Sequence, residues 1–301
     1  MRLLLTGIIA VLLSVNHVLA IEAVYIPQPR SNLDIGHEYH TSLLKKALIH
    51  GANGRAIPII KTSLHMPEAR ANYEVTKGEK VDVYWFGTDA KKERDMRAIR
   101  IPTSKGLIGY RRFIIHKDSI EKFDNIASLL ALKQQTACLG AHWPDIRILQ
   151  ASDLPVVVNT MYENIFKRVH AKRCDYFPRA YHDGYNEVSV RKNRYPNLVH
   201  YEKIVLHYPF AVYFFTPKSK ETLAAWIEDG LNAMIENGEF LRHMQSHLLT
   251  AHIFPLEQSA DVRYINIPNP SLPEDTDWKN KKYWFQPSDF GFAENKKPAL
   301  N

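Results

Sequence analysis

A stretch from Val81 to Arg94 combines a buried strand with side chains suited to binding a small carboxylate. Residues 81–86 are apolar apart from one aspartate, as expected of a parallel strand that helices cover on both faces. After this strand, Gly87 lets backbone approach a ligand closely, Thr88 offers a hydroxyl group, and Arg94 offers a planar guanidinium with five N–H donors. We therefore predict a ligand-binding strand end here.

Three further side chains are candidates for the same site. Trp85 and Trp143 are expected either to stack on a ligand or to fill the core, because an aromatic ring beside a strand end suits both roles. Arg179 is expected either in the ligand-binding cleft or in an ion pair with Asp175 or Asp183.

The histidines invite a metal interpretation, since His243 and His247 lie one helical turn apart and His252 follows closely. No acid-rich or cysteine-rich segment accompanies them, so we expect a solvated helical face and no metal site. The chain also has no Gly-x-Ser-x-Gly elbow, no His-Glu-x-x-His helix and no phosphate-binding glycine loop. We therefore expect no catalytic residues, no enzymatic activity and no cofactor.

The elements that must position these side chains alternate between strand and helix. Apolar patterns predict strands over 21–26, 56–60 and 81–86, with helices over 43–48 and 67–77 between them. A second unit of the same order, from 123 to 178, has strands over 136–140, 154–159 and 174–178. This order predicts an α/β protein in which each unit forms a mainly parallel sheet flanked by helices.

Two extended segments, Leu107–Ile115 and Tyr208–Thr216, are expected to cross between the two units as hinges. We therefore predict a discontinuous first lobe of residues 21–112 and 213–301, and a second lobe of residues 113–212. A long helix precedes Gly238, a last strand covers 262–267, and the proline- and aromatic-rich tail after it is expected to wrap a surface. In open α/β sheets ligands bind beyond the carboxyl ends of strands, which places the site in the cleft between the lobes.

Composition and the first residues indicate an exported protein. Residues 1–20 contain one early positive charge, an apolar run and a Val-Leu-Ala cleavage signal, so we predict a cleaved signal peptide. The net charge of +7 is scattered among acidic residues, which disfavours a nucleic-acid partner and leaves open an anionic ligand or surface. Cys138 and Cys174 would meet an oxidising compartment, and the sequence leaves open a disulfide or two buried thiols.

The mature chain resembles the extracellular solute-binding proteins of family 3, the type II periplasmic binding proteins of amino-acid ABC transporters. The resemblance lies in the order of elements, in both crossings and in four short phrases. These phrases are Val81-Asp-Val-Tyr-Trp-Phe-Gly-Thr88, Leu107-Ile-Gly-Tyr-Arg111, Trp143-Pro-Asp145 and Cys174-Asp-Tyr-Phe-Pro-Arg179.

The resemblance implies roles for individual residues. An arginine twelve positions after the strand aspartate clamps the ligand carboxylate in this family, and counting from Asp82 reaches Arg94. The helix beginning near His142 and Trp143 would point its N-terminus at the same ligand. The family places an acid shortly after the third strand of the second lobe, whereas here Arg179 follows and the next acid is Asp183. Two arginines facing one cleft would fit a dicarboxylate or another anionic ligand better than an ordinary amino acid.

We therefore expect a monomeric periplasmic solute-binding protein that captures a small, carboxylate-bearing or amino-acid-like solute for ABC-type uptake through an inner-membrane permease. The alternative is a periplasmic sensor or partner-binding protein with the same fold, which would dock on a membrane receptor through its aromatic tail. An enzyme on the same scaffold is a third hypothesis, and it would need a positioned acid and base in the cleft.

Overall fold

The computed structural model describes residues 21–29, 34–141, 143–256 and 262–292. The predicted signal peptide, residues 1–20, lies outside these described residues. Among the described helices, none is both long and apolar enough to span a membrane.

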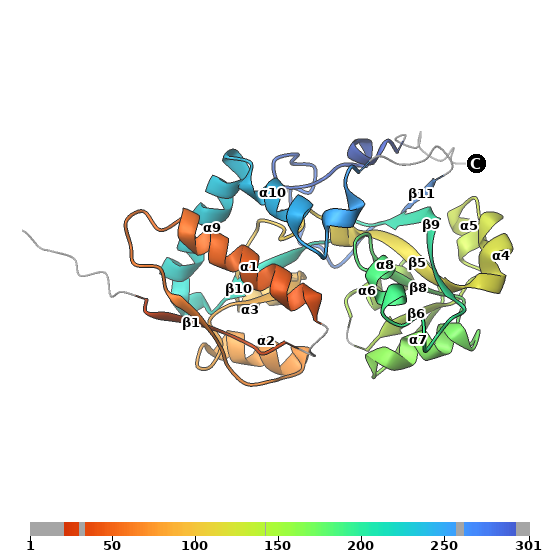
Figure 1. Ribbon diagram of the computed structural model, residues 1–301, viewed down its shortest axis with the longest axis horizontal. Helices are drawn as coiled ribbons and strands as arrows, with labels where there is room; N and C mark the ends of the chain where they lie inside the picture. The colour runs from red at the N-terminus through yellow and green to blue at the C-terminus, as the bar shows by residue number, and fades with distance from the viewer. Residues whose placement is uncertain (1–20, 30–33, 142, 257–261, 293–301) are drawn as a thin grey trace, which may run out of the picture.

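The chain forms two lobes that lie side by side (Figure 1); the described part of the first contains a two-stranded and a three-stranded sheet, the second contains one six-stranded sheet, and helices flank the sheets of both. In the first lobe, β1 pairs with β2 in parallel, while β10 lies between β3 and β4 and runs antiparallel to both. The strands of this lobe are β1 (Ala23–Ile26), β2 (Ile59–Thr62), β3 (Tyr84–Gly87), β4 (Arg97–Ile99) and β10 (Val212–Thr216). Its helices are α1 (Ile35–His50), α2 (Glu68–Lys77), α3 (Ala90–Asp95), α9 (Glu221–Glu236) and α10 (Glu239–Ser246).

Helix α1 is the central helix of this lobe. Asp34 caps its N-terminus by accepting a hydrogen bond from the His37 N–H, and the predicted apolar stripe around Leu43 and Leu44 is fully buried. Where α1 meets α9, a Cβ added to Gly230 would lie 1.8 Å from the Ala47 carbonyl oxygen. Glycine at this position therefore lets the two backbones approach closely.

The second lobe has a six-stranded mixed sheet in the order β11-β9-β5-β8-β6-β7. Pairs β6–β7, β6–β8 and β9–β11 are parallel, while β5 is antiparallel to both β8 and β9. The strands are β5 (Tyr110–His116), β6 (Ala137–Gly140), β7 (Val156–Asn159), β8 (Tyr176–Ala180), β9 (Leu198–His207) and β11 (Arg263–Asn266). The helices are α4 (Ile120–Asp124), α5 (Leu129–Leu132), α6 (Asp145–Gln150), α7 (Tyr162–His170) and α8 (Gly184–Ser189).

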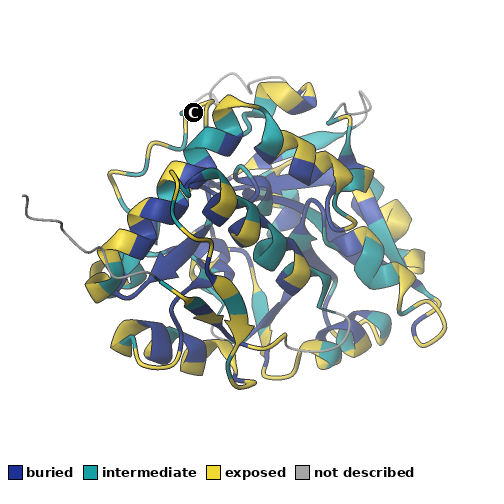
Figure 2. Ribbon diagram, turned by 60° about the vertical axis from the view of Figure 1, so that its left-hand side comes forward, coloured by how far each residue is buried: buried dark blue, intermediate teal, exposed yellow. Residues whose placement is uncertain are grey.

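Short 3-10 helices complete the described elements of both lobes. They are η1 (Leu107–Gly109), η2 (Lys117–Ser119), η3 (Lys218–Lys220), η4 (Ala251–Ile253) and η5 (Pro287–Phe290). Along the longer helices, such as α1 and α9, buried and exposed residues alternate with the helical period, so that one side of the helix is buried and the other exposed (Figure 2).

Several sequence-based expectations need correction. The strand over 81–86 was expected to be parallel, but among the described residues the ladder of β3 is formed with the antiparallel β10. Ahead of this ladder, the N–H groups of Asp82 and Val83 donate to the Tyr25 carbonyl of β1. The last strand was assigned to the first lobe, whereas β11 extends the sheet of the second lobe because its residues pair with β9 from Ile204 to His207. The crossings are also shorter than expected, since β5 and β10 already belong to the sheets and the connections are residues 100–109 and 208–211.

The tail after β11 packs against the chain itself. Trp284 and Phe290 are buried, and a Cβ added to Gly106 in the first crossing would lie 2.5 Å from the Trp284 ring. The Tyr110 hydroxyl donates to the Phe285 carbonyl at 3.1 Å. The tail therefore covers the crossings, as the expectation of a wrapped surface implies. It also buries two aromatic rings that the alternative hypothesis, a tail that docks on a receptor, would use.

Cys138 and Cys174 form a disulfide, with their Cα atoms 5.8 Å apart. Of the two alternatives that the sequence left open, the structure therefore has the disulfide, and Cys174 lies ahead of β8, outside its ladder with β6. The bridge ties β6 to the segment that leads into β8.

Candidate functional site

A cavity of about 190 Å³ lies between the lobes, and residues of both lobes and both crossings line it. The first lobe contributes the start of α1 and the end of β3, and the second contributes the start of α6 and the end of β8. Its polar lining comprises Ser104, His40, His182, Arg111, Arg179, Glu68, Asp145 and Asp183. Its apolar and aromatic lining comprises Gly36, Tyr39, Tyr84, Trp85, Phe86, Gly87, Ile108, Trp143, Pro144, Phe210, Val212 and Leu249.

Trp85 forms the aromatic wall on the side of the first lobe. Its ring stacks on His40 with centroids 4.8 Å apart and planes only 6° from parallel. His40 is fixed in turn, because its Nδ1 lies 2.6 Å from the Gly36 carbonyl oxygen and its Nε2 lies 3.1 Å from the Thr103 hydroxyl. The wall is therefore a rigid planar surface beside the cavity.

Arg111 is the buried cation at the start of β5. Its Nη2 lies 2.6 Å from Asp145 Oδ1, and its Nε donates to the Tyr208 hydroxyl at 2.8 Å. The Tyr208 hydroxyl donates to the same Asp145 oxygen, which closes a triangle of three buried groups. Nη1 of Arg111 makes no hydrogen bond to any residue in the described part of the chain. The Nη1 group of Arg111 can therefore donate a hydrogen bond to a ligand oxygen.

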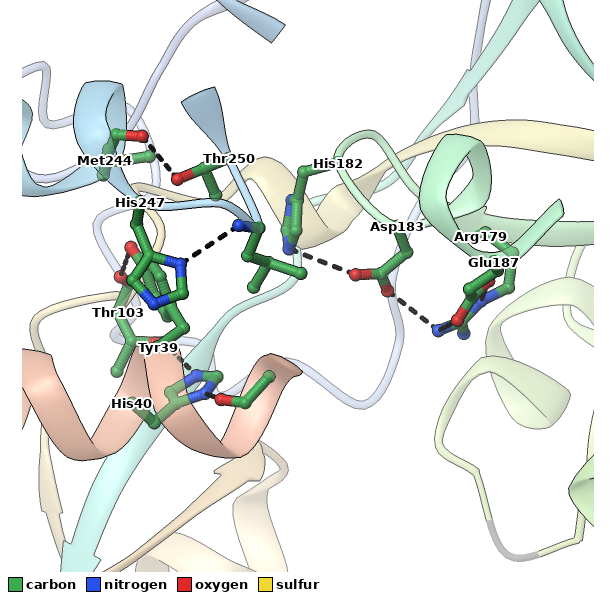
Figure 3. A network of polar contacts seen from close by, with 12 residues as sticks. Tyr39, His40, Thr103, Arg179, His182, Asp183, Glu187, Met244, His247 and Thr250 are labelled. Carbon is green, nitrogen blue, oxygen red and sulfur yellow. Dashed lines mark hydrogen bonds and ion pairs between the residues drawn. The ribbon is translucent and has the colours of Figure 1, made fainter. Parts of the chain in front are cut away.

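Arg179, at the end of β8, is held by two carboxylates. Its Nε and Nη2 donate to the two oxygens of Glu187, each at 2.7 Å, and Nη2 also donates to Asp183 at 2.8 Å (Figure 3). Burial alone would lower the pKa of Arg179, but the charges of Glu187, Tyr162 and Asp183 keep it well above its ordinary value. Its Nη1, like that of Arg111, has no hydrogen-bond partner within the described residues.

His182 lines the same cavity as these two arginines. Its Nε2 is 3.5 Å from the Asp183 carboxylate (Figure 3), and burial lowers its pKa, so the ring is neutral at pH 7. The formal charge of the lining is therefore two guanidinium groups against three carboxylates, those of Glu68, Asp145 and Asp183.

Four of the seven residues predicted for the site line the cavity: Gly87, Trp85, Trp143 and Arg179. Arg179 lines the cavity and also forms an ion pair with Asp183. His142 lies outside the described residues.

The structure does not bring Thr88 or Arg94 to the cavity. Thr88 is buried and donates its hydroxyl to Glu93, which uses up the donor expected for the ligand. Arg94 lies on α3 with 69% of its side chain exposed, 3.7 Å from Asp95. The α3 turn carries Arg94 outward, so its predicted role as carboxylate clamp has no support in this geometry.

Sequence reasoning missed Arg111, although it belongs to one of the phrases that carry the resemblance. The available signal was an arginine pair, Arg111 and Arg112, inside an otherwise apolar strand, since a charge in a buried strand requires a partner. Its partner Asp145 follows Trp143 closely in sequence. His40 and Phe210 carried no comparable signal, because only the packing of the lobes brings them to the cavity.

The histidines of α10 differ from expectation in another way. His243 is buried and its ring lies 4.8 Å from that of Tyr39, so it belongs to the core of the first lobe and not to a solvated face. Burial lowers its pKa to about 4. Within the described residues no group of histidines, cysteines and acids is arranged to hold a metal ion.

Comparisons with known proteins find similarity in structure and not in sequence: no protein-family model and no curated protein matches the chain. A histidine kinase sensor domain similar to periplasmic binding proteins matches with a TM-score of 0.53 and 16% identity, covering 75% of this chain and 95% of that one. A Salmonella typhimurium periplasmic binding protein with high arginine specificity matches with a TM-score of 0.53 and 11% identity, covering 75% and 99%. The substrate-binding protein of an amino-acid ABC transporter matches with a TM-score of 0.50 and 11% identity, again covering 75% and 99%.

These identities are too low to carry over a ligand or a partner, but the matches extend over nearly the whole length of each known structure. The chain therefore has the two-lobed α/β fold of the type II periplasmic binding proteins.

Proposed function

We propose that this protein is a periplasmic solute-binding protein that captures a small, carboxylate-bearing, amino-acid-like solute in the cavity between its lobes. One observation carries the proposal: both lobes line a cavity in which the buried Arg111 and the half-buried Arg179 each present an Nη1 with no partner among the described residues. A carboxylate accepts such donors in the plane of the guanidinium group, and the surrounding low-dielectric site strengthens the contact.

The charge balance refines the chemistry of the solute. Each arginine already has a carboxylate partner, Asp145 for Arg111 and Glu187 for Arg179. A dicarboxylate would therefore add two negative charges to a lining that already has a surplus of acid. A zwitterion adds no net charge, and its ammonium group would lie in the same cavity as the carboxylates of Asp183 and Glu68. We therefore favour a zwitterion over the dicarboxylate that the sequence suggested.

The size of the cavity points to a small solute. About 190 Å³ is less than the roughly 300–1,000 Å³ of pockets that hold drug-sized ligands. The stacked Trp85 and His40 rings offer one flat apolar wall. Delivery to an inner-membrane permease of an ABC transporter, after export by the predicted signal peptide, completes the proposed role.

A thermal-shift titration of the mature protein tests the proposal. The probes are the common amino acids and, for each amino acid that responds, the same molecule without its amine and without its carboxylate; succinate and glutarate represent dicarboxylates. At one hundred times the dissociation constant, binding adds about 2.7 kcal/mol to the free energy of unfolding and raises Tm by several degrees. We expect the zwitterion to respond and both truncated molecules to lose the response.

Arg111→Lys and Arg94→Lys are the matched variants. Lysine keeps the charge opposite Asp145 but loses the planar fork, so we expect at least tenfold weaker binding for Arg111→Lys and none of this loss for Arg94→Lys. The opposite result would restore Arg94 as the clamp. A response to dicarboxylates alone would refute the zwitterion, and no response to any probe would refute the proposed solute class.

A sensor is the second candidate, favoured by the structural match to a histidine kinase sensor domain. Both roles predict the same ligand binding. Uptake of a labelled ligand by cells with and without the protein separates them, because a sensor changes signalling and leaves uptake unaffected.

A further inference from the structure

Helix α7 and the segment beside it form a strongly basic surface on the second lobe. We call it the basic face and define it by Lys167, Arg168, Lys172, Arg173, Lys192 and Arg194. All are exposed except the half-buried Arg168. In Figure 1, α7 lies along the outer lower edge of this lobe.

Contacts at both ends of α7 show that the two segments run side by side. Arg191 pairs with Glu163, and its guanidinium lies 4.1 Å from the centre of the Phe166 ring. Tyr195 lies against His170 at the other end of the helix, with ring centroids 5.4 Å apart. The segment from 191 to 195 therefore runs along α7 in the same direction as the helix, and its cations join those of the helix and of the turn that follows it.

The acids near the basic face do not neutralise it. Glu163 forms an ion pair with Arg191, and Asp118 forms one with Lys172, whose Nζ lies 2.7 Å from the Asp118 Oδ2. The other five side chains of the basic face have no carboxylate partner among the residues that the structure describes. The face thus carries five unneutralised charges in a chain whose total net charge is +7. Part of the positive surplus that is scattered in the sequence is therefore gathered in space on this face.

Exposed apolar side chains flank the same surface. Met161, at the N-cap of α7, is 63% exposed, and Val190, next to Arg191, is 58% exposed. Cations flanked by exposed aliphatic side chains are suited to a bilayer surface, where the cations meet phosphate groups and the aliphatic groups enter the interface. A nucleic acid offers no comparable apolar layer, and an acidic protein surface is the competing partner that the test below separates from lipid.

We propose that the basic face binds the surface of an anionic phospholipid bilayer. This binding holds the protein close to the membrane while its cavity stays accessible, since the lining residues of the cavity are separate from the basic face. Lys or Arg near an anionic surface typically contributes about fivefold each to membrane partitioning, so four of them contribute roughly 600-fold. The proposal is independent of which solute the cavity binds.

Vesicle sedimentation of the mature protein tests it. The probes are vesicles of phosphatidylcholine alone and vesicles containing 30% phosphatidylglycerol, at low salt and at physiological salt. We expect binding only to the anionic vesicles, weakening as salt rises because the charges are exposed. A variant with Arg168, Arg173, Lys192 and Arg194 all changed to Gln should lose at least a hundredfold in partitioning.

A matched control changes Lys45, Lys61, Lys77 and Lys80 to Gln. These are exposed lysines of the first lobe, so the control has the same net charge as the test variant. Equal loss in both variants would show a net-charge effect and overturn the assignment to the basic face. Equal binding to both kinds of vesicle, or binding to polyglutamate with none to vesicles, would overturn the lipid surface. Unchanged melting temperatures of both variants show that the fold is intact.

Discussion

Removing the disulfide should destabilise the protein by an amount that follows from its position in the chain. Cys138 and Cys174 are 36 residues apart and both are buried. For a closed loop of this length, the chain-entropy model gives a loss of about 13 cal/mol/K in the unfolded state, or about 3.8 kcal/mol at 25 °C. For a chain of this size, Tm falls by about 2 °C for each kcal/mol of lost stability, so it should fall by about 8 °C.

The assay is calorimetry of the oxidised protein, with and without reductant, and of the double variant Cys138→Ala/Cys174→Ala. The reductant should lower Tm of the wild type and leave that of the double variant unchanged. The bridge lies between β6, whose last residue Gly140 packs against Trp143, and the segment leading to Arg179. We therefore expect weaker ligand binding as well. Two titratable thiols in the unfolded, unreduced protein, or a Tm shift below 2 °C, would refute this reasoning.

Three further predictions concern single residues. Tyr208→Phe removes hydroxyl contacts to the Arg111–Asp145 ion pair and should cost about 2 kcal/mol of stability in urea unfolding. Gly87→Ala places a methyl group 2.5 Å from the Phe210 ring, and this overpacking should cost about 1–3 kcal/mol and weaken ligand binding measured by calorimetry. Burial lowers the pKa of His207 to about 4, below the usual 6.5 of the unfolded state, so the unfolded chain binds a proton first as pH falls. Stability contributed by the neutral ring is present above pH 6.5 and should fall by about 2 kcal/mol between pH 6.5 and 5.

Matched variants check each result. Tyr185→Phe, on an exposed tyrosine, should be neutral where Tyr208→Phe is not. Adding Phe210→Leu should recover part of the loss from Gly87→Ala, and failure to do so would contradict the proposed clash. His207→Gln should flatten the pH dependence of stability, whereas a slope equal to that of wild type would show that other groups control it; the exposed His65→Gln is the control.

The fold class could be predicted from the sequence because it depends on local patterns. The apolar stripe around Leu43 and Leu44 predicts a helix, since those residues repeat with the helical period and are buried in α1. The direction in which strands pair could not be predicted in the same way. The residues around Phe86 are apolar on both faces whether the neighbouring strand runs parallel or antiparallel, so the sequence pattern alone gave the wrong direction for β3.

Only part of the candidate site could be predicted from the sequence, for a similar reason. Trp85 and Gly87 were found because a strand ends at them, and a strand end is a local feature. Arg94 was chosen by spacing from Asp82, but α3 turns its side chain to solvent. Arg111 occupies the cavity because β5 crosses into the second lobe with its guanidinium next to Asp145, and no local pattern encodes that approach.

The sequence by itself determined the alternation of strands and helices, the two-lobed α/β class and the aromatic strand end at Trp85, because each depends on residues close together in the chain. The tertiary structure decided which arginines face the cavity, that Cys138 reaches Cys174, and that scattered cations gather beside α7. Each of these depends on how distant segments pack, and burial of an ion pair such as Arg111–Asp145 is stable only where the complete fold supplies both partners.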